Sequence, residues 1–236
     1  MSEKATKTAE RGCANCRIYN CEYLNADFPA ACPTREVKGP ELESSLEIYQ
    51  GSADDAALAR AAAEVEGEFY GRLTRVEETI AFARKLKAKR LGVASCVGLM
   101  EESRILTKVF EKHGLAVKVV CCKVGAVDKV DIGLPDEIKV YPGCRESICN
   151  PVMQARYLNQ WPSDLNVVMG LCVGHDSLFI RHAEAPTTIM AAKDRVLGHN
   201  PLAALYTSNF YYRRLLNPGL GPLPKEESHG SQADPS

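Results

Sequence analysis

From residue 90 onward, short apolar runs alternate with helical segments, and this alternation limits the folds open to the chain. "RLGVASC" (residues 90–96) is typical of a buried strand, and "MEESRILTKVFEKHG" (residues 100–114) favours a helix closed by Gly114. "AVKVVCC" (residues 116–122) follows as a second strand. A strand, a helix and a strand in succession place both strands parallel in one sheet.

The remaining chain continues the pattern. Asn150 is a preferred N-cap and Pro151 suits the first turn of a helix, which leads into an expected strand at residues 166–172. A further strand is expected within residues 185–194 and a last helix over residues 200–216. We therefore predict an α/β fold with a Rossmann-like, open, mainly parallel sheet flanked by helices.

The chain before residue 90 lacks the alternation of strands and helices. Thr74 and Glu77 form a capping box at the start of a helix whose apolar residues recur at helical spacing. The predicted organisation is a flexible tail at 1–10, a four-cysteine segment at 11–40, a helical segment at 41–88, an α/β domain at 89–216 and a disordered tail at 217–236.

Charge and composition exclude several classes of protein. Lys and Arg number 29 against 30 Asp and Glu, which argues against a basic nucleic-acid surface. The start "MSEKATKTAE" lacks the apolar region of a secretory signal, and no apolar run is long enough to cross a bilayer. We expect a soluble, cytoplasmic protein with neither nucleic acid nor membrane as a partner.

Ten cysteines are unusual for a chain of 236 residues. In a reducing cytosol they favour metal binding or catalysis over disulfides, although some can serve as small apolar side chains. Four of them form a C-x2-C-x4-C-x10-C-P pattern in a segment with little apolar periodicity. Such a segment needs a cross-link, such as a bound metal, to fold. These are Cys13, Cys16, Cys21 and Cys32.

Four thiolates so close in sequence suit a tetrahedral metal or an iron–sulfur cluster. The spacing matches neither the bacterial ferredoxin run nor a common zinc finger, so it does not choose between zinc and iron. The alternative is four independent thiols in a loop.

A second set of cysteines follows the predicted strands. Cys96 and Cys172 come at the ends of their strands, and Cys149 stands just before a helix. Because the carboxyl ends of parallel strands line one edge of a sheet, these residues are expected to meet there. A helix start would lower the pKa of Cys149 and favour its thiolate.

Side chains alternate along a strand, so one of Cys121 and Cys122 should face this edge. We choose Cys122, because Lys123 and Gly125 follow it into a loop. Chance packing at the strand ends is the alternative.

Polar residues that follow the third and fourth strands are candidates for acid–base or anion-binding roles. "GLCVGHDSLF" (residues 170–179) contains His175 and Asp176, which could form an acid–base pair, and Lys193 could hold an anionic group. Asp176 could equally be a helix cap. Asp194 and His199 are further candidates, for which the alternatives are a helix cap and a satisfied loop residue, respectively. Asn200 before Pro201 is expected to be a cap.

The strings "CVGHDSLF", "KDRVLGHNPLAALY" and "CNPVMQARYLN", with the cysteine-rich start ending in "CP", resemble a family of cysteine-rich proteins from anaerobic bacteria and archaea. Its members are labelled metal-binding proteins or a domain of unknown function, and the resemblance covers roughly residues 11–216. It implies metal-ligand roles for the first four cysteines, and it favours a second set without Cys121 and Cys144. That second set is Cys96, Cys122, Cys149 and Cys172.

Three functions stay open at this point. The first is an iron–sulfur protein, with a 4Fe-4S cluster, in redox or sulfur chemistry with an electron donor or a small sulfur-containing substrate. The second has structural zinc near the N-terminus and a non-redox metal-binding or sensing α/β domain, in which zinc binding supplies folding energy. The third is a hydrolase or transferase that uses Cys172 with His175.

Overall fold

The computed structural model describes residues 12–51, 53–220 and 222, and the chain divides into two compact units at Arg72 and Leu73. The predicted tail at 1–10 and most of the predicted tail at 217–236 lie outside the described residues. Within those residues, no helix combines the length and the apolar character that a membrane crossing requires.

The first unit consists of short helical elements followed by two longer helices. Gly39, at φ +61°, and Pro40 set the start of the first longer helix, and two aspartates lie in the first turn of the second, where they favour the helix dipole. Its elements are a 3-10 helix η1 (Gly12–Asn15), α2 (Asn20–Tyr23), α3 (Pro33–Glu36), α4 (Pro40–Gln50) and α5 (Asp54–Phe69).

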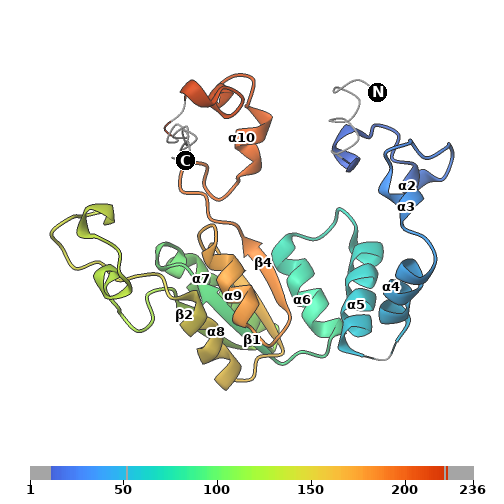
Figure 1. Ribbon diagram of the computed structural model, residues 1–236. Helices are drawn as coiled ribbons and strands as arrows, with labels where there is room; N and C mark the ends of the chain where they lie inside the picture. The colour runs from blue at the N-terminus through green and yellow to red at the C-terminus, as the bar shows by residue number, and fades with distance from the viewer. Residues whose placement is uncertain (1–11, 52, 221, 223–236) are drawn as a thin grey trace, which may run out of the picture. The chain divides into compact units, whose positions relative to one another are not determined.

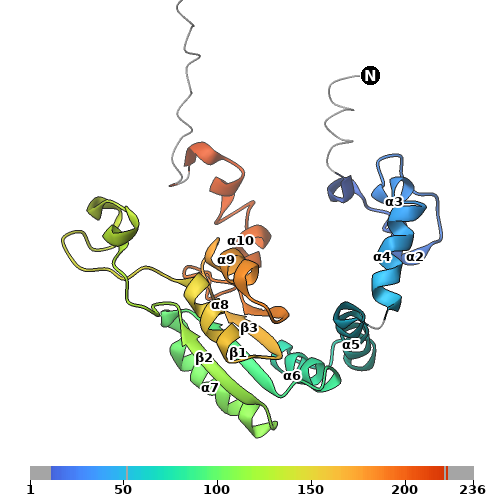
Figure 2. The ribbon, with the colours of Figure 1, turned by 60° about the horizontal axis from the view of Figure 1, so that its bottom comes forward.

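The second unit is built on a four-stranded sheet in which every pair of neighbouring strands is parallel (Figures 1 and 2). The strand order is β2-β1-β3-β4, which confirms the predicted open α/β fold. From β1 the chain adds β2 on one side, and from β3 it adds β4 on the other, so the strand order reverses between β1 and β3. Ligands bind at the carboxyl ends of strands beside such a switch point. The strands are β1 (Arg90–Ser95), β2 (Ala116–Cys121), β3 (Leu165–Met169) and β4 (Thr187–Ala191).

Helices cover both faces of this sheet. On one face, Ile80, Leu106 and Phe110 pack with sheet residues in one apolar core, and on the other Leu158 and Phe179 pack with the opposite side chains of the sheet. The helices of the first face are α6 (Arg75–Lys85) and α7 (Met100–Lys112), and those of the second are α8 (Pro151–Gln160) and α9 (His175–His182). α6 therefore belongs to the α/β unit.

Two of the three predicted helix caps in this unit are present. Thr74 Oγ1 accepts from the Glu77 backbone N–H while the Glu77 carboxylate accepts from the Thr74 N–H, which completes the capping box. Asn150 Oδ1 caps α8 by accepting from the Met153 N–H at 3.0 Å, with Pro151 in the first turn.

The predicted helix over residues 200–216 is wrong. The chain forms α10 (Leu202–Tyr206), turns, and two 3-10 helices, η5 (Arg213–Leu215) and η6 (Pro218–Leu220). α10 begins after Pro201, with no side-chain cap from Asn200. Its large apolar residues are mostly exposed, so an apolar core that would extend the helix is missing from the described part of this segment.

A long excursion separates β2 from α8. It runs over residues 123–149 and contains two 3-10 helices, η3 (Lys129–Ile132) and η4 (Asp136–Ile138). In Figures 1 and 2 it is the yellow-green segment that leaves the sheet beyond the end of β2.

Candidate functional site

Four cysteines line one cavity of about 330 Å³ at the carboxyl edge of the sheet. Cys96 directly follows β1, Cys122 directly follows β2, and Cys172 comes three residues after β3 ends at Met169. Cys149 arrives from the excursion, immediately before the cap of α8. The four predicted residues thus come together from four separate places in the chain.

Backbone hydrogen bonds continue the sheet past the last strand residues and fix two of these cysteines. The Cys96 N–H donates to Met169 O at 3.1 Å, and the Cys122 N–H donates to Ser95 O at 2.8 Å. Cys122 is 1% exposed, because its side chain lies on the same side of the sheet as the apolar core beneath α8 and α9. Cys121, the residue before it, is half-buried and does not line the cavity.

Gln154 of α8 ties the ends of β1 and β2 together. Its Nε2 donates to Ser95 O at 3.1 Å and to Val120 O at 2.7 Å, and the side chain is fully buried. The Asn150 N–H donates to Cys122 O at 2.8 Å, which brings the start of α8, and with it Cys149, to the end of β2.

The Cys122 thiol lies between the sulfurs of Cys96 and Cys149 and hydrogen-bonds with both. Its hydrogen bond lowers the pKa of Cys96 to about 5 and the pKa of Cys149 to about 5. The same two hydrogen bonds, from Cys149 foremost, raise the pKa of Cys122. Cys122 therefore keeps its proton while its two neighbours favour the thiolate that binds soft metals.

Further hydrogen-bond donors and positive charges surround these sulfurs. The Val97 N–H donates to Cys122 Sγ at 3.3 Å, and Arg195 Nη2 donates to Cys172 Sγ at 3.1 Å. Lys193 also interacts with Cys96, and Lys123 with Cys149, where both favour the thiolate. The contact with Cys172 in turn raises the pKa of Arg195.

Arg195 was not among the residues predicted from the sequence. The signal was present, since Arg195 stands two residues after Lys193 in the loop that follows β4, at the same edge of the sheet.

The three predicted acid–base or anion-binding residues have different positions. His175 lines the cavity as the first residue of α9, and its Nδ1 is buried without a hydrogen-bond partner among the described residues. Asp176 is outside the cavity lining and accepts a hydrogen bond from the Ser177 N–H at 2.8 Å. Lys193 contacts Cys96 instead of forming part of the lining.

The first four cysteines line a separate cavity of about 450 Å³ within the first unit. The backbone N–H groups of Tyr19 and Ile18 donate to the Cys16 sulfur and lower the pKa of that thiol. The set is Cys13, Cys16, Cys21 and Cys32.

All ten cysteines are free thiols, and Cys144 is exposed on the excursion. Across residues 12–51, 53–220 and 222, no group of three or more His, Cys, Asp or Glu side chains is arranged to hold a metal ion. Metal binding at either set therefore requires the thiols to turn toward a common centre.

The family model described as "Protein of unknown function (DUF1847)" matches residues 32–190. The chain belongs to this family. The matched range includes all four cysteines of the sheet edge, whereas Cys13, Cys16 and Cys21 precede it and Arg195 follows it.

The chain is also similar to an uncharacterised protein of the archaeon Methanocaldococcus jannaschii, MJ0455. The two sequences are 42% identical over 182 residues, which cover 77% of this chain and 91% of the relative. Together the comparisons establish membership in a family whose function is unknown, and they name no ligand or reaction.

Proposed function

We propose that the chain is an iron–sulfur protein whose α/β unit carries a cluster at the carboxyl edge of the sheet for redox or sulfur chemistry. The observation that carries this proposal is the convergence of four thiols from separate loops on one cavity. Chance packing of small apolar side chains does not account for hydrogen-bond donors aimed at the sulfurs. The proposed ligands are Cys96, Cys122, Cys149 and Cys172.

The surroundings fit a cluster in charge as well as in ligand type. Four thiolates repel one another unless positive groups lie nearby, and Lys123, Lys193 and Arg195 supply three positive charges. Hydrogen bonds to cluster sulfurs also help to set the reduction potential. When bound, the cluster would supply one-electron chemistry or a site for a sulfur ligand.

The first unit is proposed to hold a second cluster or a structural zinc. Backbone N–H groups directed at Cys16 are suited to a metal-bound thiolate of either kind. Because this segment has little apolar core, metal binding would also stabilise its fold.

A hydrolase or transferase that uses Cys172 with His175 has less support. The donor at the Cys172 sulfur is Arg195, and the buried His175 Nδ1 has no partner in the described part of the chain. A nucleophile of this kind needs a base within hydrogen-bond reach.

The test is the content of iron, zinc and acid-labile sulfide per chain in protein purified without oxygen. Cys122→Ala should lose the metal of the sheet edge, while Cys121→Ala, a neighbouring half-buried thiol outside the cavity, should retain it. Cys16→Ala should lose only the metal of the first unit. Equal metal content in Cys122→Ala and the unmodified chain would refute the proposal.

A further inference from the structure

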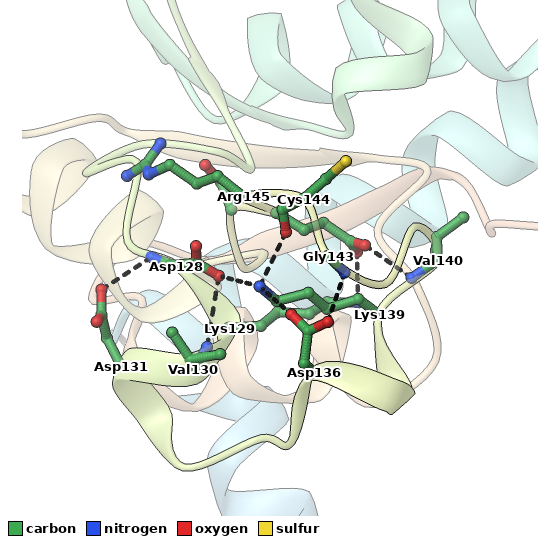
Figure 3. Close-up of polar contacts among 12 residues, drawn as sticks. Asp128, Lys129, Val130, Asp131, Asp136, Lys139, Val140, Gly143, Cys144 and Arg145 are labelled. Atoms are coloured by element: carbon green, nitrogen blue, oxygen red, sulfur yellow. Dashed lines mark hydrogen bonds and ion pairs between the residues drawn. The ribbon is translucent and has the colours of Figure 1, made fainter.

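The excursion over residues 123–149 forms a wall of the cysteine cavity, and ion pairs around one buried lysine hold it in shape. Lys139 is the centre of this network, with its side chain 4% exposed. Its ammonium lies 2.9 Å from Asp136 Oδ1 and 3.2 Å from Asp128 Oδ1, and it donates to Cys144 O at 2.9 Å (Figure 3). Lys139 thus connects Asp128, Asp136 and Cys144, which lie in three parts of the excursion.

The base of the excursion is fixed as well. Asp128 and Ser147 form an antiparallel bridge, and the Lys129 N–H donates to Glu146 O at 3.0 Å. The Lys129 ammonium and the Glu146 carboxylate form an ion pair, and Glu146 Oε2 also accepts from the Val140 N–H at 2.7 Å. The excursion is therefore a preorganised wall, held by its own contacts.

Aliphatic side chains of this wall line the cavity that the cysteines line. Ile132 and Val140 belong to the lining, yet they are 56% and 69% exposed. Ile148 and Leu134 extend the same aliphatic surface. Large apolar side chains held open on a rigid backbone, beside a cavity, are typical of a binding site for the apolar part of a small ligand.

The charged residues of the lining differ in what they contact. Lys129 and Glu146 pair with each other, and the Lys123 ammonium donates to Ser147 O at 2.6 Å. Arg195 contacts Cys172 through one nitrogen, and no second acceptor for its guanidinium lies within the described residues. A guanidinium has five N–H donors in a fixed fork that matches a carboxylate.

We propose that this cavity binds a small organic anion, with its carboxylate at Arg195 and its aliphatic body against Ile132 and Val140. The inference rests on the proposed function in one respect, which is that the bound molecule would lie beside the cluster. It adds the chemical class of the ligand, an aliphatic carboxylate or a thiol-bearing relative of one, and names Arg195 as the residue that positions it.

Binding of hexanoate to the full chain, followed by saturation-transfer NMR, tests this inference. Hexylamine has the same chain with the opposite charge, and acetate has the same charge without the apolar body. Hexanoate should bind at least roughly tenfold more tightly than hexylamine, because a charge-assisted hydrogen bond is lost with the amine. Acetate should also bind more weakly than hexanoate.

Matched variants locate the site. Ile132→Ser should weaken hexanoate binding by roughly fivefold through loss of apolar contact. Ile138→Ser changes an equally exposed isoleucine of the same excursion that does not line the cavity, so it should have no effect. Arg195→Gln should weaken hexanoate but not hexylamine.

Equal binding of hexanoate and hexylamine, or equal losses in Ile132→Ser and Ile138→Ser, would overturn the inference. Iron and sulfide are measured on the same samples, so that the two proposals fail separately. Hexanoate binding in protein without metal would support the ligand site and refute the cluster. Metal retained without hexanoate binding would refute the ligand site alone.

Discussion

Arg195 Nη2 donates a hydrogen bond to Cys172 Sγ at 3.1 Å, which joins the loop after β4 to the loop after β3. This contact lies at the carboxyl edge of the sheet, in the lining of the cavity. It places a positive charge on the sulfur of Cys172, whereas the Cys122 thiol contacts Cys96 and Cys149.

Removal of that charge is expected to change the electronic properties of the proposed cluster. Arg195→Gln should make the midpoint reduction potential more negative, because reduction adds negative charge that the guanidinium would stabilise. Arg195→Lys should restore part of the shift. Redox titration followed by electron paramagnetic resonance measures this, and an unchanged potential in Arg195→Gln would contradict the assigned contact.

Cys149 in metal-free protein should react as a thiolate in mildly acidic solution. Its pKa is lowered to about 5, chiefly by the Cys122 thiol, so the alkylation rate should rise through pH 5 and level off above about pH 6. In Cys122→Ala the midpoint should move up toward the ordinary thiol value of about 8.5. Iodoacetamide labelling with mass spectrometry of the Cys149 peptide gives both midpoints, and identical values would refute the sulfur–sulfur contact.

Asn150 and Thr74 cap different helices, and comparing them separates stability from site geometry. Each substitution to Ala should lower the free energy of unfolding of the α/β unit by about 1 kcal/mol through loss of a cap. Only Asn150→Ala should also reduce metal content, because Asn150 directly follows Cys149 at the start of α8. Denaturant unfolding and metal analysis on both variants check this, and equal metal loss would show that reduced stability is the cause.

Lys139→Met should loosen the excursion without unfolding the sheet. The change leaves Asp128 and Asp136 without their shared cation, so backbone amides between residues 128 and 148 should exchange with solvent about tenfold faster or more. Amides of α7 serve as the internal control and should keep their protection. Hydrogen exchange with mass spectrometry makes the comparison, and unchanged exchange in the excursion would show that Lys139 does not hold it.

The same network predicts how the excursion responds to pH. Lys139 lowers the pKa of Asp136, and Lys129 lowers the pKa of Glu146, so both carboxylates favour the charged form in the folded chain. Their contribution is present above the ordinary carboxyl pKa of about 4 and is lost as pH falls through the lowered values. The pKa of Lys139 is raised, with Asp136 as its main cause, so its contribution persists up to about pH 10.

Peptide-resolved proteolysis across pH tests this expectation. Cleavage within the excursion should stay slow from about pH 5 to 8 and increase below about pH 4. A loss of protection between pH 5 and 7 would instead assign the excursion's stability to groups other than these carboxylates.

The sequence predicts the sheet well because its signals are local. Apolar runs at residues 90–96 and 116–122, and the caps at Thr74 and Asn150, act within one element and depend little on distant contacts. The position of the cysteines at one edge then follows from the parallel arrangement, and the choice of Cys122 from the loop that begins at Lys123.

The shape of the excursion that forms the cavity wall could not be predicted from the sequence. Residues 123–149 have no helical or strand periodicity, and their shape depends on Lys139 meeting Asp128 and Asp136 in three dimensions. The predicted helix at 200–216 is wrong for a different reason. Its composition is helical, but composition alone does not stabilise a helix whose apolar face is uncovered.

The most direct test of the central claim is the metal coordination of the sheet edge in a Cys16→Ala variant purified without oxygen. Iron K-edge X-ray absorption should show iron bound by sulfur, with an iron–iron distance typical of a cluster, and Cys122→Ala in the same background should abolish it. Absence of iron, or iron that remains after Cys122→Ala, would contradict the account.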